Sequence, residues 1–211
     1  MDIITEIENN RSMSRITLSS GTVYWLKKTD LAGTEYAPGT EVEPDKFDHF
    51  VLLCQYPKAL NDAVVMLSRR ACGTGEIRAK LLRRRYSEQT IDMVLYKLNR
   101  EKLTDDRSFS VQWSQYRAGN SYGRSRIRRE LRQKGISEEY VEEAVASVDE
   151  EELYNQALKY AQKKMKYLNR SAIPDKEIQK TVMSLVRRGY EWDISRKACE
   201  EAARIIQSET E

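Results

Sequence analysis

The segment IRAKLLRRRYSEQTIDMVLYKL, at residues 77–98, decides the fold, because residues 127–148 repeat its pattern as IRRELRQKGISEEYVEEAVASV. The two segments align without a gap and keep matching residues at the same places. The aligned pairs are Ile77/Ile127, Leu81/Leu131, Ser87/Ser137, Ile91/Val141, Val94/Ala144, Leu95/Val145 and Leu98/Val148. A weaker third copy places Leu185 and Gly189 opposite Leu131 and Gly135. Self-similarity at a fixed period predicts a tandem array of small units.

Each copy is predicted to form three helices. Ile91, Val94, Leu95 and Leu98 follow the i, i+3, i+4, i+7 spacing of one buried helix face, and the second copy repeats that spacing. The predicted helices span residues 59–71, 74–84 and 88–100, then 106–118, 123–134 and 138–149, then 151–168, 175–188 and 192–207.

A tight turn is expected between the last two helices of each copy. Gly135 and Gly189 stand where a chain leaves a helix in the left-handed conformation. Arg85 takes this place in the first copy, and because a left-handed non-glycine residue costs about 1 kcal/mol, we expect its turn to differ slightly. Ser87 and Ser137 then stand at helix N-caps.

The first 58 residues have a different pattern. Apolar and polar residues alternate around residues 14–18 and 23–26, with a Ser-Ser-Gly turn between them, which predicts a β-hairpin. Pro44 and Asp45 could begin a helix that runs toward Cys54. We therefore predict a mainly α-helical protein, with a small N-terminal β-sheet module at 1–58 and three-helix repeats at 59–104, 105–150 and 151–211. Stacked repeats would form an elongated curved rod, and one compact helical domain is the alternative.

Composition argues against several classes of protein. Of the 211 residues, 40% are hydrophobic and 33% charged, which suits small packed units better than one large core. The longest apolar run, residues 50–54, is too short to span a membrane, and the first residues lack the basic start of a secretion signal, so we expect a cytoplasmic protein. Cys54, Cys72 and Cys199 are widely spaced and odd in number, which favours packing thiols over a disulfide or metal framework.

Few residues suit catalysis. The single histidine, His49, has no cysteine or carboxylate at a metal-binding spacing. The run GNSYGRS at 119–125 has the wrong spacing for a phosphate-binding loop and lacks its lysine. Asp105 and Asp106 lie between two copies, where an aspartate caps the next helix. We predict that the protein is not an enzyme and uses no metal or cofactor.

Charge is distributed unevenly along the chain. Residues 59–135 carry 18 basic and 8 acidic groups, whereas residues 136–158 carry 8 acidic groups and no Lys or Arg. Separate positive and negative surfaces are expected, and guanidinium groups bind phosphate or carboxylate through two parallel hydrogen bonds. We predict a basic face that binds an acidic partner, with a merely solvated surface as the alternative. This basic face comprises Arg83, Arg84, Arg85, Arg124, Arg126, Arg128, Arg129, Arg132 and Lys134. Tyr116 and Tyr122 lie near it and could stack on bases, whereas the spacing of Trp113 favours the core.

Three motifs in the chain resemble those of the RecX family of bacterial recombinase regulators. The pattern R-x-x-[SG]-x-x-E-[IL]-x-x-x-L is matched by RACGTGEIRAKL at 70–81, and L-x-D-D-x-x-[FY] by LTDDRSF at 103–109. The most specific pattern, G-x-x-x-I-x-x-E-L-x-x-K-G-I, is matched by GRSRIRRELRQKGI at 123–136. The resemblance covers roughly residues 59–205 and departs from the pattern at Arg85, where glycine is usual, and at Ser108, where an acidic residue is commoner.

The resemblance implies a non-enzymatic modulator of RecA. Such a protein lies in the groove of the RecA filament on single-stranded DNA and inhibits its ATPase, strand exchange and coprotease stimulation. The expected partners are RecA and its single-stranded DNA filament, with weak direct binding to DNA, and we expect a monomer. The anions could come from DNA or from RecA, and inhibition could work by capping filament ends, blocking growth or promoting disassembly. Two rival interpretations are a sequence-tolerant DNA-binding protein with helix-turn-helix-like units and a scaffold for an acidic protein.

Overall fold

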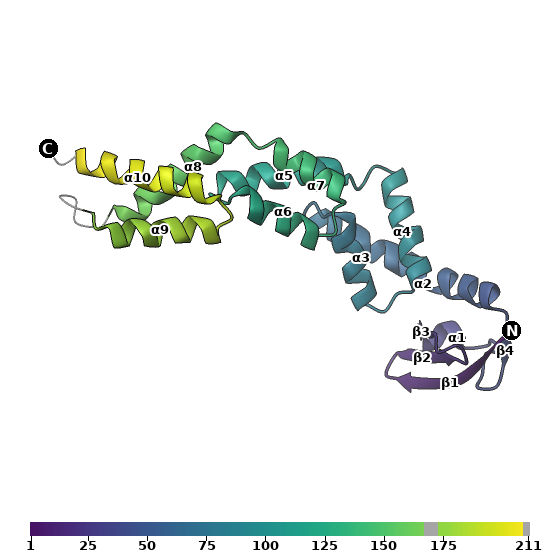
Figure 1. Cartoon of the computed structure of the whole chain (residues 1–211). Helices are drawn as coiled ribbons and strands as arrows, with labels where there is room; N and C mark the ends of the chain where they lie inside the picture. The colour runs from purple at the N-terminus through teal and green to yellow at the C-terminus, as the bar shows by residue number, and fades with distance from the viewer. Residues whose placement is uncertain (167–172, 209–211) are drawn as a thin grey trace. The chain divides into compact units, whose positions relative to one another are not determined.

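The predicted architecture of a small sheet followed by three-helix repeats is confirmed in the computed structural model of the chain, which describes residues 1–166 and 173–208. Ten helices and four strands lie in these described residues (Figure 1). The chain divides into two compact units, Met1–Asp105 and Asp106–Glu211. The finer division at residues 58, 104 and 150 stays a prediction.

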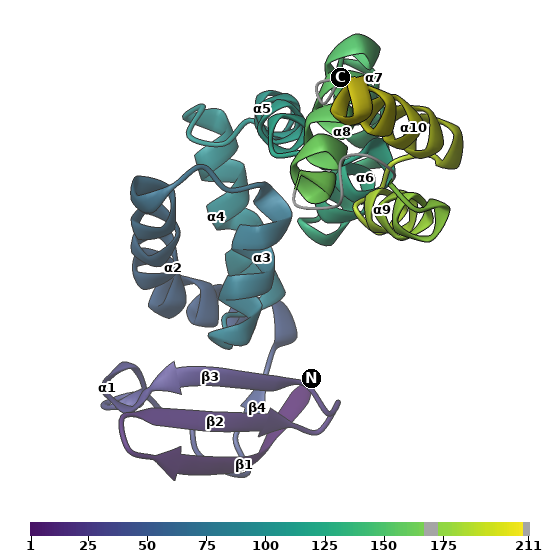
Figure 2. The ribbon, with the colours of Figure 1, turned by 90° about the vertical axis from the view of Figure 1, so that its left-hand side faces the viewer.

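The N-terminal sheet has four antiparallel strands in the order β3-β2-β1-β4. They are β1 (Asp2–Asn10), β2 (Met13–Leu18), β3 (Val23–Lys27) and β4 (Glu41–Val42), with the short helix α1 (Lys28–Leu31) after β3 (Figure 2). Every second residue of β2 is buried, so one face of the sheet carries Ile16 and Leu18 into a core with Ile4 and Leu26. The predicted hairpin is therefore present, with β2 paired to β3 across the Ser-Ser-Gly turn.

A single long helix, α2 (Pro44–Arg69), covers this sheet and continues into the first repeat. The prediction of a separate helix beginning at residue 59 is therefore wrong. A proline inside a helix removes one backbone hydrogen bond and usually ends the helix. Here Pro57 is exposed, and the buried positions Phe47, Val51, Ala59 and Ala63 continue in the same four-residue steps on both sides of it. Packing along this stripe outweighs the lost bond.

The first repeat is completed by α3 (Thr74–Arg83) and α4 (Glu88–Arg100), close to the predicted bounds. Ile77, Leu81, Ile91 and Leu98 are fully buried in its core. We expected the turn between these two helices to differ from the turns of the later repeats, and this expectation is wrong. Arg85 adopts φ +66°, which is the left-handed conformation of Gly135 and Gly189 in those repeats.

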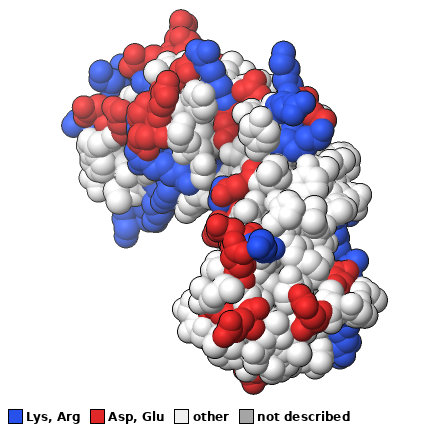
Figure 3. All heavy atoms as spheres, turned by 90° about the vertical axis from the view of Figure 1, so that its right-hand side faces the viewer, with Lys and Arg blue, Asp and Glu red and all other residues white. Residues whose placement is uncertain are grey.

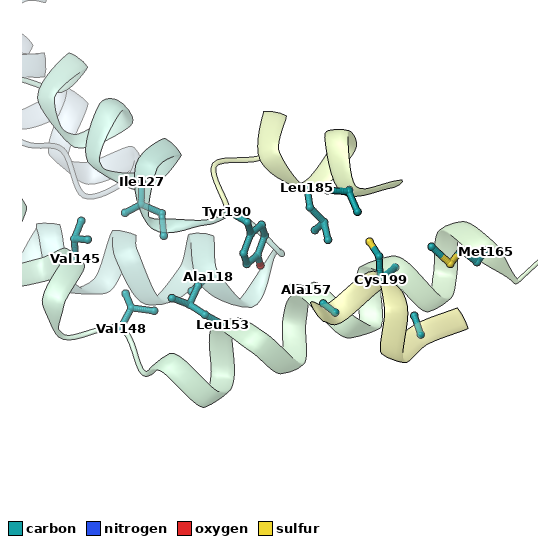
Figure 4. Close-up of a cluster of buried hydrophobic side chains, with 14 of the residues drawn as sticks. Ala118, Ile127, Val145, Val148, Leu153, Ala157, Met165, Leu185, Tyr190 and Cys199 are labelled. Atoms are coloured by element: carbon teal, nitrogen blue, oxygen red, sulfur yellow. The ribbon is translucent and has the colours of Figure 1, made fainter. Parts of the chain in front are cut away.

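The second unit contains the second and third repeats. Its helices are α5 (Asp106–Gly119), α6 (Arg124–Gln133), α7 (Glu138–Ala146), α8 (Glu150–Met165), α9 (Asp175–Arg187) and α10 (Trp192–Ser208). All six match predicted helices, although the end predicted for α8 at residue 168 lies outside the described residues. One hydrophobic core joins the two repeats, and Tyr190 points into it among Ala118, Ile127 and Leu153 (Figure 4).

Two glycines allow the start of α6 in the second repeat to pack against the turn after α9 in the third, and we call this contact the interlock. A Cβ added to Gly123 would lie 2.2 Å from the Gly189 carbonyl oxygen, and Gly189 itself has φ +93°. The Gly123 amide donates to the Arg188 carbonyl at 3.0 Å, and the Ser125 amide donates to the Gly189 carbonyl at 3.1 Å. The carbonyls that end α9 thus satisfy amides at the start of α6, which have no partner within their own helix.

The three cysteines are thiols outside any disulfide, and two of them pack in the interior as predicted. Cys72 and Cys199 are buried and Cys54 is half-buried. Burial raises the pKa of Cys199 to about 12, so its thiol is protonated and unreactive at neutral pH.

Candidate anion-binding surface

Six of the nine residues of the predicted basic face lie on α6 or at its C-cap. The helix has a narrow apolar stripe, formed by the buried residues Ile127 and Leu131, and arginines occupy most of its remaining surface. Periodicity fixes which side of α6 faces the core, and this orientation carries the arginines onto the outer sides of the helix.

Two of these arginines are paired with the acidic helix that follows. Arg128 forms a two-bond contact with Glu142, at 2.5 and 2.9 Å, and Arg132 forms a similar contact with Glu138. Hydrogen bonds from Arg132 and Arg128 lower the pKa values of Glu138 and Glu142, respectively, so both carboxylates stay charged at neutral pH. Charges that are separate in the sequence are therefore adjacent in space, and small groups of both signs alternate on the face drawn in Figure 3.

Arg124 of α6 and Lys134 at its C-cap also contact neutral groups of the same unit. Arg124 donates to the Val148 carbonyl at 2.9 Å. The Lys134 ammonium lies 4.1 Å from the centre of the Trp113 ring, a cation–π distance. Arg129, in contrast, is exposed and has no ion pair with any residue that the structure describes. It is the cation of α6 best placed to reach a partner.

Three guanidinium groups surround one aromatic ring at the interlock. Arg117, Arg126 and Arg188 lie 3.9, 4.4 and 4.2 Å from the centre of the Tyr122 ring. Among the described residues, Glu130 alone forms ion pairs with this cluster, accepting from Arg117 at 2.5 Å and Arg126 at 3.0 Å. Burial raises the pKa of Glu130, but these hydrogen bonds outweigh burial and hold it below the ordinary value. The cluster therefore keeps a positive excess.

The excess of positive charge extends into a surface hollow of about 550 Å³ beside the Tyr122 cluster. Lys159, Lys163 and Lys164 of α8 line it together with Asn120 and Arg188, and no carboxylate of the described residues belongs to its lining. Arg188 is fixed there, since it donates to the Ser121 and Asn120 carbonyls at 2.7 and 2.8 Å. A concave surface lined by one sign of charge concentrates counter-ions, so the hollow can hold a phosphate or carboxylate group.

The three remaining predicted cations lie in the first unit, on and after the last turn of α3. Arg84 forms a salt bridge with Asp62, and the Arg85 guanidinium lies 4.2 Å from the centre of the Trp25 ring. Arg83 is exposed and has no ion pair among the described residues.

Arg117, Arg188 and the lysines of α8 were not among the predicted site residues. A signal for Arg188 was present, because the repeat register places Arg84, Lys134 and Arg188 at equivalent positions, one before the left-handed residue of each turn. The lysines stand together in sequence, but only the interlock brings Arg188 to them.

Other chemistry has little support among the described residues. No group of three or more His, Cys, Asp or Glu there could hold a metal ion, and His49 is exposed. None of the described helices is long and apolar enough to cross a lipid bilayer.

Comparisons with known proteins match each of the three repeats. Models of the first, second and third three-helix domains of RecX match residues 59–98, 105–145 and 150–199. The regulatory protein RecX of Chlorobaculum tepidum is 33% identical over 155 residues, covering 71% of this chain and 94% of that protein. RecX of Bacillus subtilis is 27% identical over 220 residues, covering the whole chain and 81% of that protein.

Two solved structures share the fold. A crystal structure of regulatory protein RecX aligns with a TM-score of 0.62 at 22% identity, covering 95% of this chain and all of the other. The crystal structure of RecX from Lactobacillus salivarius also aligns with a TM-score of 0.62, at 21% identity, covering 70% of this chain and 96% of that one.

Proposed function

The chain belongs to the RecX family of regulatory proteins, and on this premise we propose that it binds the RecA filament on single-stranded DNA and inhibits its ATPase, strand exchange and coprotease activities. In this proposal the protein acts in the cytoplasm, as a monomer and without catalysis of its own. Its effect on recombination and DNA repair comes from binding alone.

The local positive excess around the Tyr122 ring and in the lysine-lined hollow of the second unit is the observation that carries this proposal. Both RecA-bound DNA and an acidic protein surface would present anions to it. The surface that we assign to this contact comprises Arg129, Arg188, Lys159, Lys163 and Lys164, none of which has an ion pair with a described residue. Arg128 and Arg132 contribute less, because Glu142 and Glu138 already neutralise them.

RecA-dependent ATP hydrolysis on single-stranded DNA is the decisive assay. Addition of this protein in amounts well below those of RecA should slow hydrolysis. Unchanged hydrolysis at a large excess of the protein would rule out the proposal.

The contact surface is tested with the combined substitutions Arg129→Gln, Lys159→Gln and Lys163→Gln. Inhibition should weaken and become less dependent on salt, since each lost phosphate contact lowers the logarithmic salt slope by about 1. The matched control is Arg196→Gln with Lys180→Gln, which removes exposed cations that already pair with Glu200 and Glu177. Equal inhibition by the two variants would show that the assigned surface is merely solvated.

The same reagents distinguish the rival functions. Tight binding to naked duplex DNA that RecA does not change would favour the DNA-binding protein. Capture of RecA with no change in its activity would favour the scaffold.

A further inference from the structure

A second cavity, of about 550 Å³, lies within the first unit, between the N-terminal sheet and the first repeat. The β1–β2 turn and β3 form one wall, and α2 with the turn after α3 forms the other. Gln55, only 5% exposed, joins the walls, because its amide nitrogen donates to the Trp25 carbonyl at 2.8 Å and its oxygen accepts from the Ser87 amide at 2.8 Å. The cavity is thus a preformed space of a size usual for small-molecule sites.

Its charged lining favours an anion. Five cations line the cavity, against the two carboxylates of Asp30 and Asp62. Arg84 and the Tyr86 hydroxyl already bind Asp62. Arg11, Lys58 and Arg85, in contrast, form no salt bridge with any part of the chain that the structure describes.

The rest of the lining favours a flat, partly apolar group. Trp25 and Tyr86 contribute aromatic rings, and Met13 and Leu26 contribute apolar surface. Aromatic side chains next to cations are the usual means by which proteins stack a base and hold its phosphate.

Backbone strain also points to this cavity. Arg11 (φ +41°) and Arg85 (φ +66°) both adopt the left-handed conformation and both line it. The second and third repeats have Gly135 and Gly189 at the position of Arg85, so the turn itself does not need a side chain there. Residues in strained backbone conformations persist where the surrounding structure fixes them, and they cluster at ligand sites. Lys102 and Ser121 also adopt positive φ away from this cavity, but Arg85 directs its guanidinium to 4.2 Å from the centre of the Trp25 ring in the cavity wall.

We propose that this cavity binds a nucleotide, with the base against the wall of Trp25 and Tyr86 and the phosphate at Arg11, Lys58 and Arg85. The nucleotide comes either free from solution or as one unit of a single-stranded nucleic acid. This inference does not depend on RecA, so its test can fail while the proposed function stands, and the reverse.

The half-buried Cys54 lines the cavity and provides the readout. The full-length protein is treated with a thiol reagent in the presence of AMP, a thymidine oligonucleotide or inorganic phosphate, and the rate of Cys54 modification is measured. Cys72 and Cys199 are buried and should react only after unfolding. Protection by AMP indicates a site for free nucleotides, and protection by the oligonucleotide at lower concentration indicates a site for a strand.

Two variants test the assigned residues. Lys58→Gln removes one charge, and Arg85→Gly gives the first repeat the glycine found in the others, so its fold should persist. Each should weaken protection about tenfold, the usual effect of losing one hydrogen bond to a charged group. Lys46→Gln is the control, since Lys46 is an exposed cation of the same helix that pairs with Glu43 outside the cavity.

Two outcomes would overturn the proposal. Equal protection by inorganic phosphate and by the nucleotides would show that the cavity does not recognise a base. No protection by any of the three probes would show that it is only a seam between the sheet and the repeat. Circular dichroism of each variant establishes that its fold is intact.

Discussion

Replacing Gly123 with alanine tests the interlock between the second and third repeats. The added Cβ would lie 2.2–2.3 Å from the carbonyl group of Gly189 and the amide nitrogen of Tyr190, all backbone atoms that cannot rotate away. The two chain segments must therefore separate. Separation breaks the hydrogen bonds from Gly123 to Arg188 and from Ser125 to Gly189.

The expected loss of stability follows from these contacts. Two hydrogen bonds contribute roughly 0.5–1.5 kcal/mol each, and forcing a group into a filled core costs about 1–3 kcal/mol. Tyr190, which is 4% exposed, would also lose part of its packing. We therefore expect the Gly123→Ala variant to be less stable by roughly 2–6 kcal/mol.

Urea denaturation followed by far-UV circular dichroism measures this loss. Hydrogen exchange adds a local readout, because the Ser125 amide should lose its protection. Gly119→Ala is the matched control, since nothing lies within 4 Å of its added Cβ, and its stability should be unchanged or slightly raised by the helix preference of alanine. A Gly123→Ala variant as stable as the Gly119→Ala variant would refute the close-contact argument.

Three further predictions concern polar contacts. The double substitution Glu138→Gln and Glu142→Gln should strengthen binding to heparin, because it releases Arg132 and Arg128 from their ion pairs. The melting temperature should change little, since exposed ion pairs contribute less than about 1 kcal/mol. Weaker heparin binding would contradict these ion pairs. Gln55→Leu should lower the free energy of unfolding by about 2–4 kcal/mol, because it leaves the Ser87 amide and the Trp25 carbonyl without partners. Urea denaturation measures this loss, and Gln112→Leu, at an exposed position, is the control. The lowered pKa of Glu130 stabilises the fold at pH values above the ordinary glutamate pKa, and this stabilisation is lost as pH falls through the folded-state pKa. The melting temperature of the Glu130→Gln variant should therefore fall less steeply with decreasing pH than that of the unsubstituted protein. Parallel plots of melting temperature against pH would refute the stabilising role of the Glu130 contacts with Arg117 and Arg126.

Helix positions could be predicted from the sequence because each repeat carries its own apolar stripe. Ile91, Val94 and Leu98 specify which face of their helix is buried without knowledge of any neighbour. The continuity of α2 could not be predicted in this way, because a proline inside a helix, here Pro57, usually ends it. Only the packing of Phe47 against the sheet and of Ala63 in the first repeat shows why the helix continues.

The candidate site was less predictable, because a charge count does not say which groups are paired. The contact between Arg128 and Glu142 depends on how two helices fold back on each other across a turn. The contacts of Arg188 with Asn120 and Ser121 depend on the interlock. The sequence contains many basic residues, and the structure shows which of them have carboxylate partners.

The interlock also bears on the order in which the chain folds as it leaves the ribosome. The amides at the start of α6 take their partners from Arg188 and Gly189, which are synthesised long after the whole second repeat. Until those residues emerge, the Gly123 and Ser125 amides at the start of α6 lack their hydrogen-bond acceptors. Tyr190 is also missing from the core that contains Ile127. We therefore expect the second repeat to remain incompletely folded during synthesis and to become stable only when the third repeat joins it.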